Sequence, residues 1–251
     1  MKFNNETYAK QIRLKSLDDF IDSIVSKKRN EMWVSVTTKN QNGDYINLDK
    51  VNNCLDVGTT SDEHYQSSNF FIKMLPRRIE ISTFSDQVSS FDTSKGLSYQ
   101  VYNSYVGDIS LKMELTKTFD LVICSATLEH VGSIRNQTMA IQNLIALSHN
   151  YLLITVPNRW HPIEFHSRLP LIHWLPENLW RKAFNLIPGL KGLSKESNLN
   201  FISASQIISM IDKDSRVKAV SVHKIRLLGF VSNFAILVAL DQSSRDSTRS
   251  P

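Results

Sequence analysis

The chain has 251 residues, of which 41% are hydrophobic and 21% charged, a balance typical of a globular protein that buries a substantial core. Its net charge of +5 is not concentrated in a block of Lys and Arg, so the sequence permits nucleic acid or an anionic membrane surface as a partner but indicates neither. The longest apolar runs, 151–156 and 234–240, are too short to cross a bilayer, and the first residues lack the apolar stretch of an export signal. We therefore expect a cytoplasmic protein in which Cys54 and Cys124 are reduced thiols inside the core.

The first half of the chain predicts one helix and three strands. Apolar residues recur at helical spacing over 16–28, with Ser16 as the expected N-cap, and this helix precedes the first strand as a cover for the sheet or for a ligand. Short apolar segments then predict strands at 54–57, which ends at Gly58, at 78–84 and at Phe119–Ser125. The last of these is almost continuously apolar, as expected of a strand covered on both faces.

The second half continues the alternation of helix and strand. A helix is predicted over 135–148, followed by a buried strand over 151–156 that Pro157 stops. Ser203 and Gln206 form the pattern of a capping box, which predicts a helix through Ile211. The segments 222–228 and 234–240 are close enough in sequence to pair as a hairpin around Gly229.

This order of elements predicts an α/β fold with a mostly parallel sheet, helices on both faces and one antiparallel strand near the end. Sheets of this kind bind ligands beyond the carboxyl ends of their strands. The positions that follow a predicted strand end are therefore the candidate ligand contacts: Gly58, Ser85, Asp86, Asp108, Ser125 and Pro157.

Two motifs carry a resemblance to a known family. Leu55-Asp56-Val57-Gly58 resembles the first motif of class I S-adenosylmethionine (SAM)-dependent methyltransferases, and residues 119–131 resemble their fourth-strand motif. Gly107-Asp108 stands where that family often has an acidic residue, and 151–157 matches its fifth strand. The resemblance, to the type 11-like members in particular, runs from about Val51 to Leu240. It implies a Rossmann-like, seven-stranded sheet with a C-terminal antiparallel hairpin, and S-adenosyl-L-methionine as the cofactor.

The resemblance also implies roles for individual residues. Gly58 and Thr60 would lie against the methionine end of SAM, with Asp56 near its ammonium group. Asp86 would bind the ribose and Asp108 the adenine amino group, while Ile109 would cover the ring. Ser125, Ala126 and Leu128 would line the path to the sulfonium methyl group, while His130 would have a site or structural role that is shared across the fold.

The segment after the fifth strand is rich in His, Arg and Trp, and its prolines prevent one long helix. We expect a lid or acceptor pocket in which His161, Glu164 or His166 acts as general base. Arg159, Trp160 and Arg168 would contact the substrate. Alternatively, the segment is a hydrophobic cap with structural hydrogen bonds, or its tryptophans touch a membrane surface. The spacing His161-x-x-Glu164-x-His166 is not that of a helical metal-ligand pair, so no metal site is predicted.

The expected organisation is an N-terminal helical cover (1–50), a SAM-binding core (51–157), an inserted segment (158–200), the rest of the core (201–240) and a disordered tail (241–251). The expected function is methyl transfer to oxygen of a small-molecule, sugar or lipid-linked acceptor. Only Gly58 remains of the usual glycines, so the alternative is a catalytically degenerate binding protein of the same fold. An NAD-linked oxidoreductase is disfavoured because a pyrophosphate needs the glycine-rich turn. Nothing in the sequence indicates an oligomer.

Overall fold

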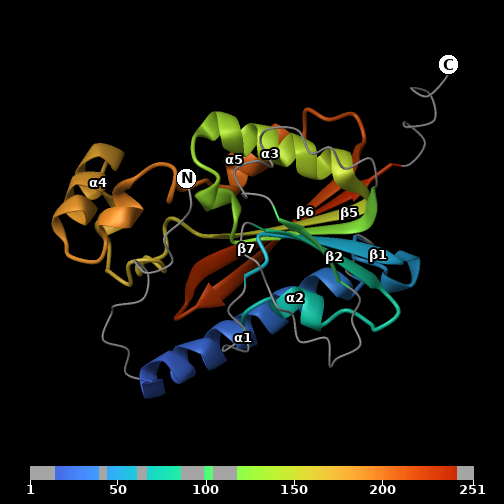
Figure 1. Cartoon of the computed structure of the whole chain (residues 1–251), viewed down its shortest axis with the longest axis horizontal. Helices are drawn as coiled ribbons and strands as arrows, with labels where there is room; N and C mark the ends of the chain where they lie inside the picture. Colours follow the sequence, from blue (N-terminus) through green and yellow to red (C-terminus); the bar gives the residue numbers. More distant parts are fainter. Residues whose placement is uncertain (1–14, 40–43, 61–66, 86–98, 104–117, 242–251) are drawn as a thin grey trace.

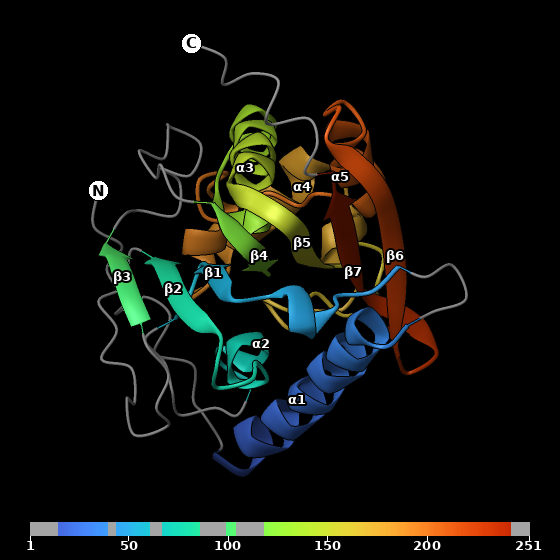
Figure 2. The same cartoon turned by 90° about the vertical axis from the view of Figure 1, so that its right-hand side faces the viewer.

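The computed structural model describes residues 15–39, 44–60, 67–85, 99–103 and 118–241. Within these ranges, seven strands form one sheet in the order β3-β2-β1-β4-β5-β7-β6 (Figure 2). The strands are β1 (Asn53–Val57), β2 (Glu80–Ser85), β3 (Tyr99–Asn103), β4 (Phe119–Ser125), β5 (Ser148–Pro157), β6 (Val217–Leu227) and β7 (Phe230–Leu240).

The direction of the strands confirms the predicted mostly parallel sheet. All neighbours from β3 to β5 pair in parallel, whereas β7 is antiparallel to both β5 and β6. Strands β2 and β3 lie on one side of β1 in the sheet, and β4 and β5 lie on its other side. The reversal of strand order therefore falls between β1 and β4, which is where open α/β sheets bind their ligands.

Helices cover both faces of the sheet, as predicted (Figures 1 and 2). On one face lie α1 (Lys15–Thr37) and the short α2 (Phe70–Lys73), and on the other lie α3 (Ile134–Leu147) and α5 (Ala204–Ile211). The remaining α-helix of the described residues, α4 (Glu177–Leu186), lies beyond one end of the sheet (Figure 1). Short 3-10 helices occur at Leu48–Lys50 (η2), Leu128–His130 (η5), Ile172–Trp174 (η6) and Lys191–Ser194 (η7).

Alternate residues of each central strand enter two separate cores. In β1, Cys54 packs with the residues of α1 and α2, while Leu55 packs with those of α3 and α5, and both side chains are fully buried. The same division separates Leu121 from Val122 in β4. This burial on both faces explains the nearly continuous apolar run that predicted β4. Cys54 and Cys124 are buried free thiols, as expected.

The limits of several elements differ from the predictions. The first helix extends to Thr37 rather than ending at 28, because Met32, Trp33 and Val36 continue its buried side past a charged stretch. Ser16 lies inside this helix and is not its N-cap. β5 begins at Ser148, directly after α3. Neither α2 nor β3 was predicted, since α2 is a single turn and β3 lacks an apolar run.

Two local predictions are confirmed in atomic detail. Ser203 accepts a hydrogen bond from the backbone of Gln206, whose side chain binds back to the Ser203 N–H, so the capping box is complete. β6 and β7 form a hairpin joined by Leu228 and Gly229, with φ of 53° and 85°. Positive φ at both residues is the geometry of a two-residue hairpin turn that follows the twist of the strands.

Candidate functional site

The loop after β1 is built around Gly58. Its φ is +87°, and its N–H donates to the carbonyl oxygen of Phe84 at 2.8 Å, which ties the loop to β2. A Cβ atom at this position would lie 2.1 Å from Oγ1 of Thr127, the residue that follows β4 by two positions. The ends of β1 and β4 therefore meet here so closely that only glycine fits.

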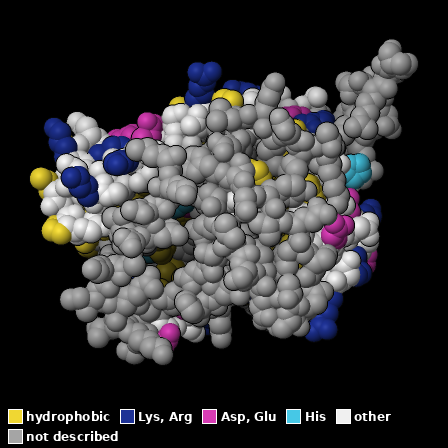
Figure 3. Space-filling view, in the orientation of Figure 1, with side chains coloured by type: hydrophobic (Ala, Val, Ile, Leu, Met, Phe, Trp, Pro, Cys, Tyr) yellow, Lys and Arg dark blue, Asp and Glu magenta, His cyan; other side chains and the backbone are white. Residues whose placement is uncertain are grey.

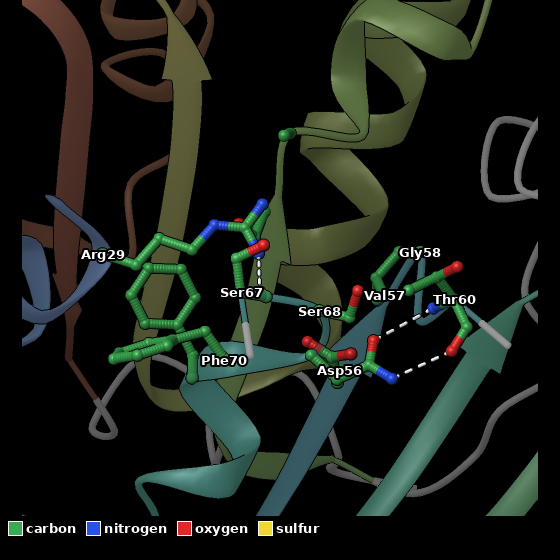
Figure 4. Close-up of a pocket in the computed structure, with 12 residues that line it drawn as sticks. Arg29, Asp56, Val57, Gly58, Thr60, Ser67, Ser68 and Phe70 are labelled. Atoms are coloured by element: carbon green, nitrogen blue, oxygen red, sulfur yellow. Dashed lines mark hydrogen bonds between the residues drawn. The ribbon is translucent and has the colours of Figure 1, made fainter. Parts of the chain in front are cut away.

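A cavity of about 220 Å³ opens at this meeting point (Figure 4). We name it the carboxyl-edge cavity. Its lining comes from α1, from the β1 end, from the α2 region and from the β4 end: Arg29, Asp56, Val57, Gly58, Thr60, Ser67, Ser68, Asn69, Phe70, Phe71, Ser125 and Ala126. The structure thus brings together five of the predicted cofactor contacts, which are Asp56, Gly58, Thr60, Ser125 and Ala126.

Asp56 is the acidic group of the cavity and is only 7% exposed. Burial raises the pKa of its carboxyl group from 3.8 to about 6, against the lowering effects of a hydrogen bond from Thr59 and of the charge of Arg29. The Thr59 hydroxyl donates to Oδ2 of Asp56 at 2.7 Å. A cation bound beside Asp56 would favour its charged form, so this carboxylate is suited to receive an ammonium group.

Arg29 places a guanidinium group in the same cavity, and the sequence analysis did not identify it. The side chain reaches from α1 to donate to the backbone carbonyl of Ser67 (Figure 4). Burial lowers the pKa of Arg29, while the charges of Asp56 and Asp22 raise it. The sequence did contain a sign that Arg29 faces the interior, because it lies one helical turn before Met32 and Trp33, which are on the buried side of α1.

Asn69 is a second residue that the sequence analysis missed. Its side-chain amide accepts from the backbone N–H of Thr60 at 3.0 Å and donates to the carbonyl of Thr60 at 2.9 Å. These two hydrogen bonds, drawn as dashed lines in Figure 4, join residue 60 to residue 69 across the intervening segment. They hold Thr60 and the start of α2 against the cavity.

The β4 side of the cavity carries a strained residue. Ala126 has φ of 50°, a conformation that costs a non-glycine residue about 1–2 kcal/mol. Its N–H donates to the carbonyl of Thr155 at 2.8 Å, and the hydroxyls of Ser125 and Thr155 lie 2.8 Å apart. These bonds to β5 hold the strained turn in place at the cavity wall.

Other predicted cofactor contacts lie elsewhere. Leu128 is 1% exposed and packs in the core beside α3, not on the cavity wall. His130 is directed toward the inserted segment, where its Nδ1 lies 2.6 Å from the carbonyl oxygen of Asn198. Asp86, Asp108 and Ile109 fall outside the described residues.

The three predicted general bases do not line the carboxyl-edge cavity. His161 is 1% exposed and stacks on Phe165 at 4.9 Å between ring centroids. Glu164 and His166 are paired, with Oε1 and Nδ1 2.7 Å apart. Against the raising effect of burial, hydrogen bonds from His166 and Ser167 and the charge of His166 lower the pKa of Glu164 to about 2, so it is an anion at neutral pH. The role of any of them as a base stays a prediction.

Of the predicted substrate contacts, Trp160 and Arg168 are exposed on the inserted segment, whereas Arg159 is half-buried. The guanidinium of Arg159 lies over the rings of Trp160 and Phe201, at 5.6 and 5.8 Å from their centroids. Trp160 is 60% exposed, and Arg168 is exposed with φ of 59°. Further large apolar side chains are exposed on this segment: Ile163, Phe165, Leu171, Trp174, Leu175, Leu179 and Leu186. Figure 3 shows apolar and basic side chains at the surface where α4 lies.

The sheet order with a reversed β7, together with a glycine-bearing loop at the switch between β1 and β4, defines the fold of class I SAM-dependent methyltransferases. The resemblance noted in the motifs is therefore confirmed at the level of the fold.

Comparisons with solved structures agree. The structure is similar to the N-methyltransferase NodS from Bradyrhizobium japonicum in complex with S-adenosylhomocysteine (SAH), with TM-score 0.54, 11% identity, and 94% of this chain and 95% of that chain covered. It is also similar to 1,6-didemethyltoxoflavin-N1-methyltransferase from Burkholderia thailandensis, with 1,6-didemethyltoxoflavin and SAH bound. There the TM-score is 0.52 and the identity 9%, over 90% of this chain and 82% of that chain.

No protein-family model matches the chain, and no curated protein matches it in sequence. No helix in the described part of the chain has both the length and the apolar character needed to cross a bilayer.

Proposed function

We propose that this chain binds SAM in the carboxyl-edge cavity and transfers its methyl group to a small-molecule acceptor. The observation that carries the proposal is the buried carboxylate of Asp56 beside the backbone of Gly58, at the switch point of a methyltransferase fold. Both structures described above contain SAH, the product that remains when SAM has given up its methyl group.

The charges of the cavity suit the amino-acid end of SAM. That end carries an ammonium and a carboxylate, and the cavity offers Asp56 to the first and Arg29 to the second. Gly58 leaves its backbone open for close approach. The cavity volume of about 220 Å³ is below the roughly 300–1,000 Å³ typical of drug-sized ligands, so the described residues account for part of the site. We assign them to the methionine end of SAM.

The reaction is a direct displacement. An acceptor atom attacks the methyl carbon as the carbon–sulfur bond breaks, and the electron pair stays on sulfur to give SAH. Because the sulfonium is a good leaving group, the protein contributes mainly alignment and exclusion of water. Ser125 and Ala126, at the strained end of β4, form the wall on the acceptor side.

We further propose an acceptor with an apolar portion, a small molecule or a sugar- or lipid-linked compound, methylated on oxygen. The exposed apolar side chains of the inserted segment support this choice, since they offer a surface on which such a portion can pack. A hydroxyl acceptor needs a base. His161 remains our candidate because its Nε2 has no hydrogen-bond partner among the described residues.

Titration calorimetry with SAM and SAH tests the proposal directly. Wild type should bind both, and Asp56→Asn should weaken SAM binding while the exposed Asp212→Asn does not. If wild type binds neither, the assignment of the cavity is wrong. If wild type binds both but transfers no labelled methyl group to any of a panel of hydroxylated acceptors, the degenerate binding protein becomes the better description.

A further inference from the structure

Outside the carboxyl-edge cavity, a carboxylate and two imidazoles converge where η5 meets the inserted segment. One ligand atom each from Glu129, His130 and His166 lies within 4.8 Å of the other two. Nε2 of His166 is 3.9 Å from Oε1 of Glu129, and the two histidine rings are 5.0 Å apart in an edge-on arrangement. We name this group the Glu129 cluster.

Glu129 is an unusual residue to bury. It is 1% exposed, and neither of its carboxylate oxygens has a hydrogen-bond partner among the described residues. A buried carboxylate without hydrogen bonds is strongly unfavourable unless a cation lies beside it. Two imidazoles lie beside it, and one nitrogen of each is within 4.8 Å of a Glu129 carboxylate oxygen.

The Nδ1 atoms of both imidazoles already have hydrogen-bond partners. Nδ1 of His130 lies 2.6 Å from the carbonyl oxygen of Asn198, and Nδ1 of His166 lies 2.7 Å from Oε1 of Glu164. A carbonyl or carboxylate oxygen only accepts, so each Nδ1 carries a proton and donates it. In the neutral rings, Nε2 therefore keeps its lone pair. Metal-bound histidines are held by this same outer set of carbonyl and carboxylate partners.

We propose that Glu129, His130 and His166 bind one divalent first-row transition-metal ion, with Zn²⁺ the best match. Two imidazoles and one carboxylate are a zinc ligand set that leaves a further position open. Mg²⁺ and Ca²⁺ prefer oxygen ligands throughout and fit this set poorly. Tetrahedral bonds of about 2.0–2.1 Å put ligand atoms about 3.3 Å apart, so the three ligand atoms, which lie within 4.8 Å of one another, have to draw together around the ion.

A protonated His166 is the competing explanation for the buried charge. It satisfies Glu164 at 2.7 Å, but at 3.9 Å it makes no hydrogen bond to Glu129. It also leaves Nε2 of His130 without a role. A metal ion engages all three groups at once, and it links η5, which follows β4, to the inserted segment. The site does not depend on SAM binding or on methyl transfer.

The sequence analysis predicted no metal site because it tested only the spacing of His161, Glu164 and His166. Of those three residues, only His166 is a ligand of the proposed site, and Glu164 positions it through a hydrogen bond to Nδ1. The other two ligands are the adjacent residues Glu129 and His130.

The test uses the full chain stripped of metal by a chelator. Zn²⁺ binding is measured by calorimetry, and Co²⁺ binding by its visible absorption, for wild type, Glu129→Gln and His166→Gln. We expect wild type to bind one ion per chain and both variants to lose at least tenfold in affinity. Glu164→Gln should weaken binding by about 10–100-fold, as outer partners of metal ligands do. His149→Gln on β5, outside the cluster, should bind as wild type does.

Thermal melting gives a second readout that separates binding from folding. Zn²⁺ should raise the melting temperature of wild type but not of Glu129→Gln, since an ion that binds only the folded state stabilises it. The metal-free variant should melt no lower than metal-free wild type, because it removes an unpaired buried charge. Equal Zn²⁺ affinity in wild type and Glu129→Gln would overturn the proposal. So would a metal-free Glu129→Gln that melts far below metal-free wild type, because that result assigns the charge to a protonated His166.

Discussion

Replacing Gly58 with alanine tests how closely the ends of β1 and β4 approach each other. The backbone at φ +87° costs an alanine about 1–2 kcal/mol. The new Cβ would also lie 2.1, 2.7 and 3.0 Å from Oγ1, Cγ2 and Cβ of Thr127, so Thr127 has to move. Overpacking of this kind typically costs about 1–3 kcal/mol.

Moving Thr127 also strains its hydrogen bonds. Its hydroxyl faces the carbonyls of Val57 at 3.2 Å and Ser125 at 3.0 Å, and a net hydrogen bond is worth about 1 kcal/mol. Gly58→Ala should therefore destabilise the ligand-free protein by about 3–6 kcal/mol. At about 2–4 °C per kcal/mol for a chain of this size, the melting temperature should fall by roughly 6–24 °C.

The matched control is Gly189→Ala. Gly189 has φ +85°, and a Cβ there would meet nothing within 4 Å, so it carries the backbone cost alone, about 1–2 kcal/mol. Thermal and urea denaturation followed by circular dichroism compare the two variants. If Gly58→Ala and Gly189→Ala lower stability equally, Thr127 does not pack on Gly58 as described.

Four further predictions concern the carboxyl-edge cavity and the proposed general base. Because the folded-state pKa of Asp56 is raised to about 6 from 3.8, its neutral form stabilises the ligand-free protein at low pH, and about 3 kcal/mol should be lost as pH rises from about 4 through 6. Urea melts across this range should show that slope in wild type and not in Asp56→Asn. For the same reason, SAM binding measured by calorimetry should tighten about tenfold between pH 5 and pH 7 and then level off, since the charged carboxylate receives the ammonium; a flat profile would separate Asp56 from the ligand. Arg29→Met should weaken SAM binding about tenfold or more, as expected for a hydrogen bond to a charged group, whereas the exposed Lys27→Met should leave it unchanged. Once an acceptor is known, His161→Gln should lower turnover and spare SAM affinity, and unchanged turnover would remove its role as base.

The sequence was sufficient where local chemistry decides the structure. The apolar run of Phe119–Ser125 matches β4 residue for residue, and the capping box at Ser203 places the start of α5. Gly58 was also placed correctly in the turn after β1, because the end of a buried strand followed by glycine is a local pattern. In each case the signal lies within a few neighbouring residues.

The rest could not be predicted because it depends on packing between distant segments. Arg29 reaches the cavity only because α1 crosses beneath the sheet, and Asn69 matters only because its amide returns to Thr60. The pairing of Glu129 with His166 joins residues on either side of a whole helix and strand. Leu128 was expected at the cofactor, but its position faces α3 and the core.

The inserted segment contains an apolar cluster of its own. Trp180, Phe184, Leu190, Leu193 and Leu199 pack on one another, with the rings of Trp180 and Phe184 5.2 Å apart. Since these side chains supply the segment's internal cohesion, its outward-facing residues are free to vary without disturbing the sheet. Substitutions on the outer face of this segment can therefore accumulate without altering the packing that holds the ends of β1 and β4 together.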